Sequence, residues 1–190
     1  MSADSRFDRS FSHALTLPVD RHSRYVLFSD CHRGTGTSGD NFLKNQHLYF
    51  AALQHYLKEG FTYLELGDGD ELWENRSFAQ IKSIHNNSFW LLSQFYCRGR
   101  LHMLYGNHDM VKKYPRFTKC NCSTYPCSTC QEEELFPGMP FHESIILQNC
   151  GSGPDIYLTH GHQASFLNST LWRLSRFLVR YVWKPLELIG

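Results

Sequence analysis

"VLFSDCHRG", residues 26–34, is the stretch from which the fold can be worked out. Its apolar run ends in Asp30 and His32, two residues apart. A fold without a ligand has little use for a carboxylate and an imidazole at the end of a buried strand. The pair therefore indicates that this strand end binds something.

The same pattern returns twice along the chain. Strands are predicted over residues 24–30, 61–68 and 101–109, and helices over 42–58 and 78–96. Three strands that alternate with helices along the chain indicate an α/β fold with a largely parallel sheet. Ligands bind beyond the carboxyl ends of such strands. We therefore expect one site that combines Asp30, His32, Asp68, Asn107 and His108.

The rest of the chain is expected to complete a single domain over residues 1–190. A polar arm, a cysteine-rich insertion, two strands and an amphipathic helix are predicted, over 1–23, 115–140, 143–148, 155–160 and 168–184 in that order. The last of these strands ends on His160, which would bring another imidazole to the site.

The composition is that of an ordinary soluble globular protein. Of the 190 residues, 42% are hydrophobic and 19% are charged, and the formal net charge is +1. A charge this close to zero argues against extended binding of nucleic acid. The early residues lack the apolar run of a signal peptide, and no apolar stretch is long enough to span a membrane. We therefore expect a cytoplasmic protein whose cysteines stay mostly reduced.

The residue types at the strand ends suit a metal site. Asp30, His32, Asp68, Asn107 and His160 offer hard oxygens and imidazole nitrogens, which fit Mn, Fe or Zn better than Ca or Cu. A carboxylate shared between two cations defines a two-metal site. Metals about 3.5–4 Å apart can activate water and hold both ends of an in-line phosphoryl displacement.

Four motifs in order carry a family resemblance. They are "DCH" (30–32), "LGDGDE" (66–71), "YGNHD" (105–109) and "LTHGH" (158–162). Together they resemble the calcineurin-like metallophosphoesterase superfamily, which implies an αββα sandwich. The stretches "LGDGDELWEN" and "THGHQASFLN" look most like bacterial UDP-2,3-diacylglucosamine hydrolase-like phosphoesterases. That group usually carries Arg where His108 stands, a departure that favours a more general phosphoesterase.

The resemblance implies a role for each residue. Asp30 and His32 would bind the first metal, Asn107 and His160 the second, and Asp68 both. His108 would lie over the phosphate, and Asp109 would orient the His108 side chain. The implied reaction is hydrolysis of a phosphate monoester, diester or pyrophosphate bond by a metal-bridging hydroxide. Asp70 and Glu71 are expected behind the ligands or in solvent, although Glu71 and Glu74 are also candidates for ligand contact.

One element of the family pattern is missing. The family usually ends in a G-H-x-H motif that completes both metal shells, and "GHQA" (161–164) holds only the first of its histidines. We expect His162 to replace one missing ligand, and we interpret the chain as an N-terminal portion or shortened member. The incomplete motif leaves open a catalytically impaired metal-binding scaffold, and a nucleic-acid phosphodiesterase is a second enzyme hypothesis.

The insertion holds a second candidate metal site. "KCNCSTYPCSTC" places Cys120, Cys122, Cys127 and Cys130 as C-x-C followed by C-x-x-C. This spacing is compatible with a structural zinc ion that pins the loop. Disulfides and free thiols are the alternatives.

The last helix carries a basic stripe, formed by Arg173, Arg176, Arg180 and Lys184. Such a stripe is typical of a solvated helix face, and the alternative is contact with anionic lipid or with a phosphorylated substrate. Arg33, Arg173 and Arg176 are therefore candidate substrate contacts. The expected partner is a phosphorylated small molecule or a lipid-linked substrate, with peripheral membrane contact as a further possibility.

Overall fold

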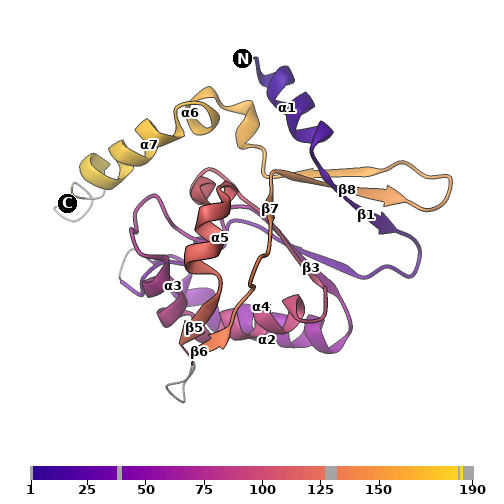
Figure 1. The fold of residues 1–190 in the computed structure, drawn as a ribbon, viewed down its shortest axis with the longest axis horizontal. Helices are drawn as coiled ribbons and strands as arrows, with labels where there is room; N and C mark the ends of the chain where they lie inside the picture. The colour runs from indigo at the N-terminus through magenta and orange to yellow at the C-terminus, as the bar shows by residue number, and fades with distance from the viewer. Residues whose placement is uncertain (1, 38–39, 127–131, 184, 186–190) are drawn as a thin grey trace.

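A four-stranded parallel sheet lies at the centre of the fold. The computed structural model describes residues 2–37, 40–126, 132–183 and 185 (Figure 1). The strands follow one another across the sheet in the order β2 (Tyr25–Phe28), β3 (Thr62–Leu66), β4 (Leu101–Leu104) and β7 (Phe141–His142). The prediction of an α/β fold with a parallel sheet is confirmed.

A second sheet of three strands faces the first. Its order is β1 (Leu15–Val19), β8 (Ser144–Asn149) and β9 (Ile156–Thr159). β1 runs parallel to β8, with Leu15 opposite Ile145, and β9 runs antiparallel to β8.

The prediction of a polar arm over residues 1–23 is wrong. This segment holds the helix α1 (Ala3–Ser12) as well as β1. The strand "LTLPV" is short and contains Pro18, which the central strands of a sheet do not tolerate but an edge strand does. Ser10 of α1 is buried, and its hydroxyl donates to the hydroxyl of Ser144 at 3.0 Å.

Apolar side chains fill the space between the two sheets. Leu64 and Leu104 of the central sheet pack with Ile145 and Leu147 of β8. Tyr63 and Met103, one position away on β3 and β4, belong instead to the larger core on the other face. Alternate residues of a strand point to opposite faces, so the central strands are apolar on both sides.

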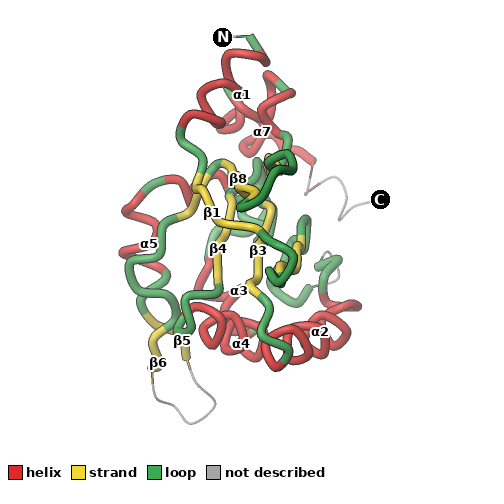
Figure 2. The backbone as a smooth tube through the Cα atoms, turned by 90° about the vertical axis from the view of Figure 1, so that its right-hand side faces the viewer, coloured by secondary structure: helices red, strands yellow, loops and turns green. Residues whose placement is uncertain are grey.

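Helices cover that other face of the central sheet. The short 3-10 helix η1 (Leu43–Asn45) leads into α2 (Gln46–Lys58), and α3 (Phe78–Ile84) is followed by α4 (Asn86–Tyr96). Two helices therefore replace the single one predicted over 78–96, and they meet at His85. α2 and α4 lie side by side along one end of the molecule (Figures 1 and 2).

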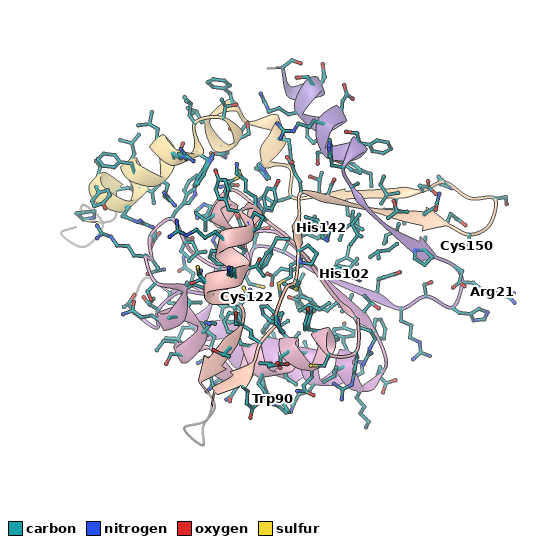
Figure 3. All side chains as sticks on the ribbon, in the orientation of Figure 1. Arg21, Trp90, His102, Cys122, His142 and Cys150 are labelled. Atoms are coloured by element: carbon teal, nitrogen blue, oxygen red, sulfur yellow. The ribbon has the colours of Figure 1, made fainter. Side chains whose placement is uncertain are left out.

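The segment predicted as a cysteine-rich insertion has regular structure. After η2 (Met110–Lys113) come α5 (Pro115–Asn121), β5 (Thr124–Pro126) and β6 (Glu132–Glu134), and β5 and β6 pair as an antiparallel hairpin. Cys122 follows α5 and is fully buried in the main core. Figure 3 shows Cys122 among interior side chains and Cys150 at the distant turn between β8 and β9.

The C-terminal helix is interrupted, contrary to the prediction of one helix over 168–184. After the turn η3 (His162–Ala164) come α6 (Phe166–Ser169), α7 (Trp172–Leu178) and one π-helical turn, η4 (Val179–Trp183). Lys184 lies outside the described residues. α1 and α7 occupy the end of the molecule opposite α2 and α4 (Figures 1 and 2). Within the described residues, no helix has the length and apolar character needed to cross a membrane.

Candidate metal centre

The loops that follow four strands bring the predicted ligands together. Asp30 and His32 follow β2, Asp68 follows β3, Asn107 follows β4, and His160 follows β9 of the second sheet. The Oδ2 atom of Asp68 lies 3.2 Å from Nε2 of His160 and 3.9 Å from Nε2 of His32. Nε2 of His32 is also 3.7 Å from Oδ1 of Asp30. Asp68 thus lies between two imidazoles, where one carboxylate can serve two cations.

Both imidazoles are held in the orientation that a metal ligand requires. Nδ1 of His32 lies 2.8 Å from Oε2 of Glu71, and Nδ1 of His160 lies 3.0 Å from the carbonyl oxygen of Leu66. Each acceptor holds a proton on Nδ1, so Nε2, which faces Asp68, is the nitrogen that a metal could bind in place of a proton. Metal-binding histidines in proteins are commonly supported in this way.

Asn107 and the backbone beside it orient the same carboxylate and imidazole. The side-chain oxygen of Asn107 lies 3.2 Å from Nε2 of His160. The amide N–H of His108 donates to Oδ1 of Asp68 at 2.8 Å. Asp68 therefore keeps Oδ1 occupied and turns Oδ2 toward the histidines.

The side chain of His108 is held by Glu71 rather than by Asp109. Nδ1 of His108 lies 2.8 and 2.9 Å from the two oxygens of Glu71, and its ring stacks on Trp73 with ring centres 4.2 Å apart. Asp109 is fully buried and accepts instead from the backbone N–H of Gly106 and from Lys112. The expectation that Asp109 orients His108 is wrong, because its carboxylate points into the protein interior.

Glu71 lies behind the candidate ligand His32, which is one of the places where the sequence led us to expect it, but its contact with His108 was not predicted. Its carboxylate also accepts the backbone N–H groups of Trp73 and Glu74, at 3.1 and 3.2 Å. One fixed carboxylate therefore positions both His32 and His108. The position of Glu71 and Trp73 shortly after "GD" placed them near the site. The sequence does not show which way either side chain points, so their contacts with His108 could not be predicted.

Backbone strain is concentrated at the candidate ligands. Asp30, His32 and Asp68 have φ values of 54°, 48° and 51°, and they are the positive-φ residues other than glycine in the described chain. The left-handed region is unfavourable for such residues, and strain of this kind gathers at functional sites. Gly106 lets the backbones meet here, since a Cβ atom on it would overlap Oδ1 of Asp68.

The charges at the site shift several pKa values. Burial would lower the pKa of His32, but the hydrogen bond to Glu71 and the charges of Glu71, Asp68 and Asp30 raise it to about 9. Burial would raise the pKa of Glu71, but hydrogen bonds from His108 and His32 lower it to about 2. The pKa of Asp68 is also lowered, chiefly by its interaction with His160, against the effect of burial. The site attracts cations.

A separate network of buried charges lies beneath the site. Arg33 is fully buried and donates to Glu65 and Asp70 at 2.8 Å each, so the expectation that it contacts substrate is wrong. The ammonium of Lys112 lies 2.6 Å from carboxylate oxygens of both Asp70 and Asp109. Glu65, Asp70 and Asp109 are close enough to bind a metal together, but Lys112 already supplies their cation.

His162 is buried beside the centre without joining it. Its ring centre lies 5.8 Å from that of His160, and its Nδ1 atom has no hydrogen-bond partner in the described part of the chain. Burial and the neighbouring His160 lower the pKa of His162 to about 4. Two other groups of potential ligands, Asp30–Asp68–His160 and His32–Glu71–His108, do not include it.

The other predicted site residues lie elsewhere. Arg173 donates to the hydroxyl of Tyr114 at 3.1 Å and Arg176 lies over the ring of Trp172, so their contact with substrate stays a prediction. Arg180 donates to the carbonyls of Leu72, Trp73 and Asn75 and so fixes the loop that carries Glu71.

The four-cysteine zinc site also stays a prediction. Cys127 and Cys130 lie outside the described residues. Cys120 is exposed, whereas burial raises the pKa of Cys122 to about 12 and disfavours the thiolate that zinc binds.

In comparisons with known proteins, no family model, no curated protein and no solved structure matches this chain. The case for a metal centre therefore rests on its donor set. Two carboxylates, two imidazoles and an amide oxygen converge, and the backbone is arranged to hold them. Such a set fits divalent Mn, Fe or Zn.

Proposed function

We propose that this protein hydrolyses phosphate esters with two divalent metal ions held by Asp30, His32, Asp68, Asn107 and His160. The observation that carries the proposal is the position of Asp68 Oδ2, between two Nε2 atoms at 3.2 and 3.9 Å. Both Nδ1 atoms are hydrogen-bonded on the far side of their rings, so the Nε2 atoms and Oδ2 are the atoms left to bind a cation.

The side chains have distinct tasks in such a reaction. Bound metals would activate water at neutral pH and offset the charge of the phosphate. His108 stands at the edge of the centre with Nδ1 held by Glu71, so its Nε2 atom is suited to protonate the departing oxygen. The stacking of Trp73 on His108 keeps the ring in that orientation.

The arrangement of the two sheets supports the more specific fold assignment. Two sheets that face each other, with helices outside the central one, supply three of the four layers of the αββα sandwich implied by the sequence motifs. In that fold the ligands come from loops at the carboxyl ends of the strands, as Asp30, Asp68 and Asn107 do here.

The first experiment is elemental analysis of the purified protein, followed by hydrolysis assays with p-nitrophenyl phosphate and its bis-ester. We expect about two Mn, Fe or Zn ions per chain and metal-dependent release of nitrophenol. Asp68→Asn should lose bound metal and bring hydrolysis below detection, because an amide cannot bridge two cations. Asp8→Asn, on the exposed side of α1, is the matched control and should change neither.

A metal-binding scaffold is the second candidate. The position of His162 outside both ligand groups favours it, since neither group then gains a further imidazole. Wild-type protein that retains metal yet hydrolyses no phosphate ester would support the scaffold and refute the enzyme. Wild-type protein without metal would refute both.

A further inference from the structure

A cavity of about 660 Å³ opens beside the candidate metal centre. Asp30, His32, Glu71 and His108 are among the residues that line it, so a ligand there would touch the centre directly. Its volume lies in the range of about 300–1,000 Å³ that is usual for pockets that bind small molecules.

Five other lining residues form an apolar wall. They are Phe28, Phe42, Leu48, Tyr49 and Ala52, which come from β2, the loop after it and α2. Phe42 and Tyr49 are nearly fully buried and pack edge to face against each other, so this wall is rigid.

The polar side chains that line the cavity limit the charge that a bound ligand can carry. Asn41 and Asn45 are neutral, Glu74 is acidic, and no Lys or Arg is among the described lining residues. Beyond the proposed metals, a second phosphate group placed here would meet the carboxylate of Glu74 and no Lys or Arg, which is unfavourable. An uncharged organic group would meet an apolar wall and two amides.

We infer that this cavity binds an uncharged, largely apolar organic group that is esterified directly to the reacting phosphate. The inference rests on the proposed function. It narrows the substrate class to esters with one phosphate and excludes pyrophosphates and polynucleotides. Hydrolysis would break the bond between phosphorus and the ester oxygen, add the oxygen of water to phosphorus, and place a proton on the departing alcohol. His108 lines the cavity where that proton is needed.

Non-hydrolysable phosphonates allow binding in the cavity to be measured without hydrolysis. We would titrate the Mn-loaded protein with methylphosphonate and benzylphosphonate by calorimetry. The benzyl group should tighten binding at least about tenfold, because it buries apolar surface that the methyl group lacks. Ala52→Phe should fill the cavity and abolish this gain while it leaves methylphosphonate affinity unchanged. Ala51→Phe is the matched control, because Ala51 precedes it on α2, is exposed and does not line the cavity.

Each outcome has one meaning. Equal affinity for both phosphonates, or a gain that survives Ala52→Phe, would overturn the inference and leave the proposed function standing. Binding of neither would overturn both. A gain in affinity together with no hydrolysis of any phosphate ester would keep the cavity assignment for ligand binding and refute the enzyme. If Ala52→Phe does not fold, Leu48→Ser at the 74% exposed rim should reduce the gain in its place.

Discussion

Two groups of charged side chains lie at the same edge of the central sheet, and they differ in what neutralises them. In the buried network, Arg33 and Lys112 are fixed within hydrogen-bond distance of the carboxylates that they neutralise. In the candidate metal centre, Asp30 and Asp68 face histidines, whose charge depends on a proton. The network is complete without a ligand, whereas the centre gains a fixed charge only from bound cations.

Neighbouring residues of one motif go to different groups. His32 faces the centre and Arg33 the network; Glu71 faces the centre and Asp70 the network; His108 faces the centre and Asp109 the network. A charged residue in such a motif is therefore not a ligand merely because its neighbour is one. A carboxylate of the network has the side chain of Arg33 or Lys112 beside it, whereas a carboxylate of the candidate metal centre does not.

The largest effect should come from breaking the network. Lys112→Met removes the cation between Asp70 and Asp109 and leaves buried carboxylates without it. We expect the free energy of unfolding to fall by about 3–5 kcal/mol. Urea denaturation measures this loss, and Lys119→Met, at an exposed position, should be nearly neutral. A loss below about 1 kcal/mol would show that the network is not the structural element we describe.

Gly106→Ala should disturb the point where the two groups touch. The added Cβ would overlap both Oδ1 and the backbone nitrogen of Asp68, so Asp68 must move. Forcing an atom into such a contact costs about 1–3 kcal/mol, and metal content should fall as well. Gly151→Ala, in the turn between β8 and β9, should alter neither. Normal metal content in Gly106→Ala would argue against Asp68 as the shared ligand.

Glu71→Gln and Asp70→Asn test the comparison at adjacent positions. The NH2 group that Glu71→Gln introduces must face either the imidazoles of His32 and His108 or the backbone N–H groups that Glu71 now accepts, so metal affinity should fall about 10–100-fold with little loss of stability. Asp70→Asn should do the reverse, because the Asp70 carboxylate pairs with the buried cations. Calorimetric metal titration and urea denaturation of both variants give the two readouts. If both variants changed metal affinity and stability in the same way, the buried network and the metal centre would not be functionally distinct.

The smallest effect is expected from a histidine outside both groups. His85 is buried, its Nε2 lies 3.1 Å from Asp40, and its Nδ1 has no partner among the described residues. Burial lowers the pKa of His85, although Asp40 acts in the opposite direction. The unfolded chain then takes up the proton more readily, so stability should fall as pH drops below about 6.5 and through the lowered pKa.

The variant His85→Gln should remove that part of the pH dependence. The difference between wild-type and variant unfolding free energies, measured at about pH 7.5 and about pH 5.5, isolates it. An unchanged difference across this range would show that the pKa of His85 is not lowered.

The sequence was sufficient to predict the sheet and the convergence of the ligands. Polar residues directly after apolar strands must gather at one edge of a parallel sheet, so Asp30, Asp68 and Asn107 could be placed together without knowledge of any contact. His160 was predictable for the same reason, although its strand belongs to the second sheet.

Side-chain direction within the loops could not be predicted. Whether Arg33 points toward solvent or into the interior depends on φ values in the preceding residues, and these are left-handed at Asp30 and His32. β1 was missed for a different reason. Five residues that contain a proline carry little signal alone, and their stabilising partner, β8, lies far along the chain.

That distance affects how the protein is made. Leu15 pairs with Ile145, 130 residues later, and Arg6 of α1 donates to the carbonyl of Gln163. At about 5–20 residues per second, a ribosome needs roughly 6–26 s to supply the partner of β1. Throughout that interval the apolar side chains of Leu15, Leu17 and Val19 have no sheet to cover them. The N-terminal segment is thus the part of the nascent chain for which a chaperone has the most time to compete.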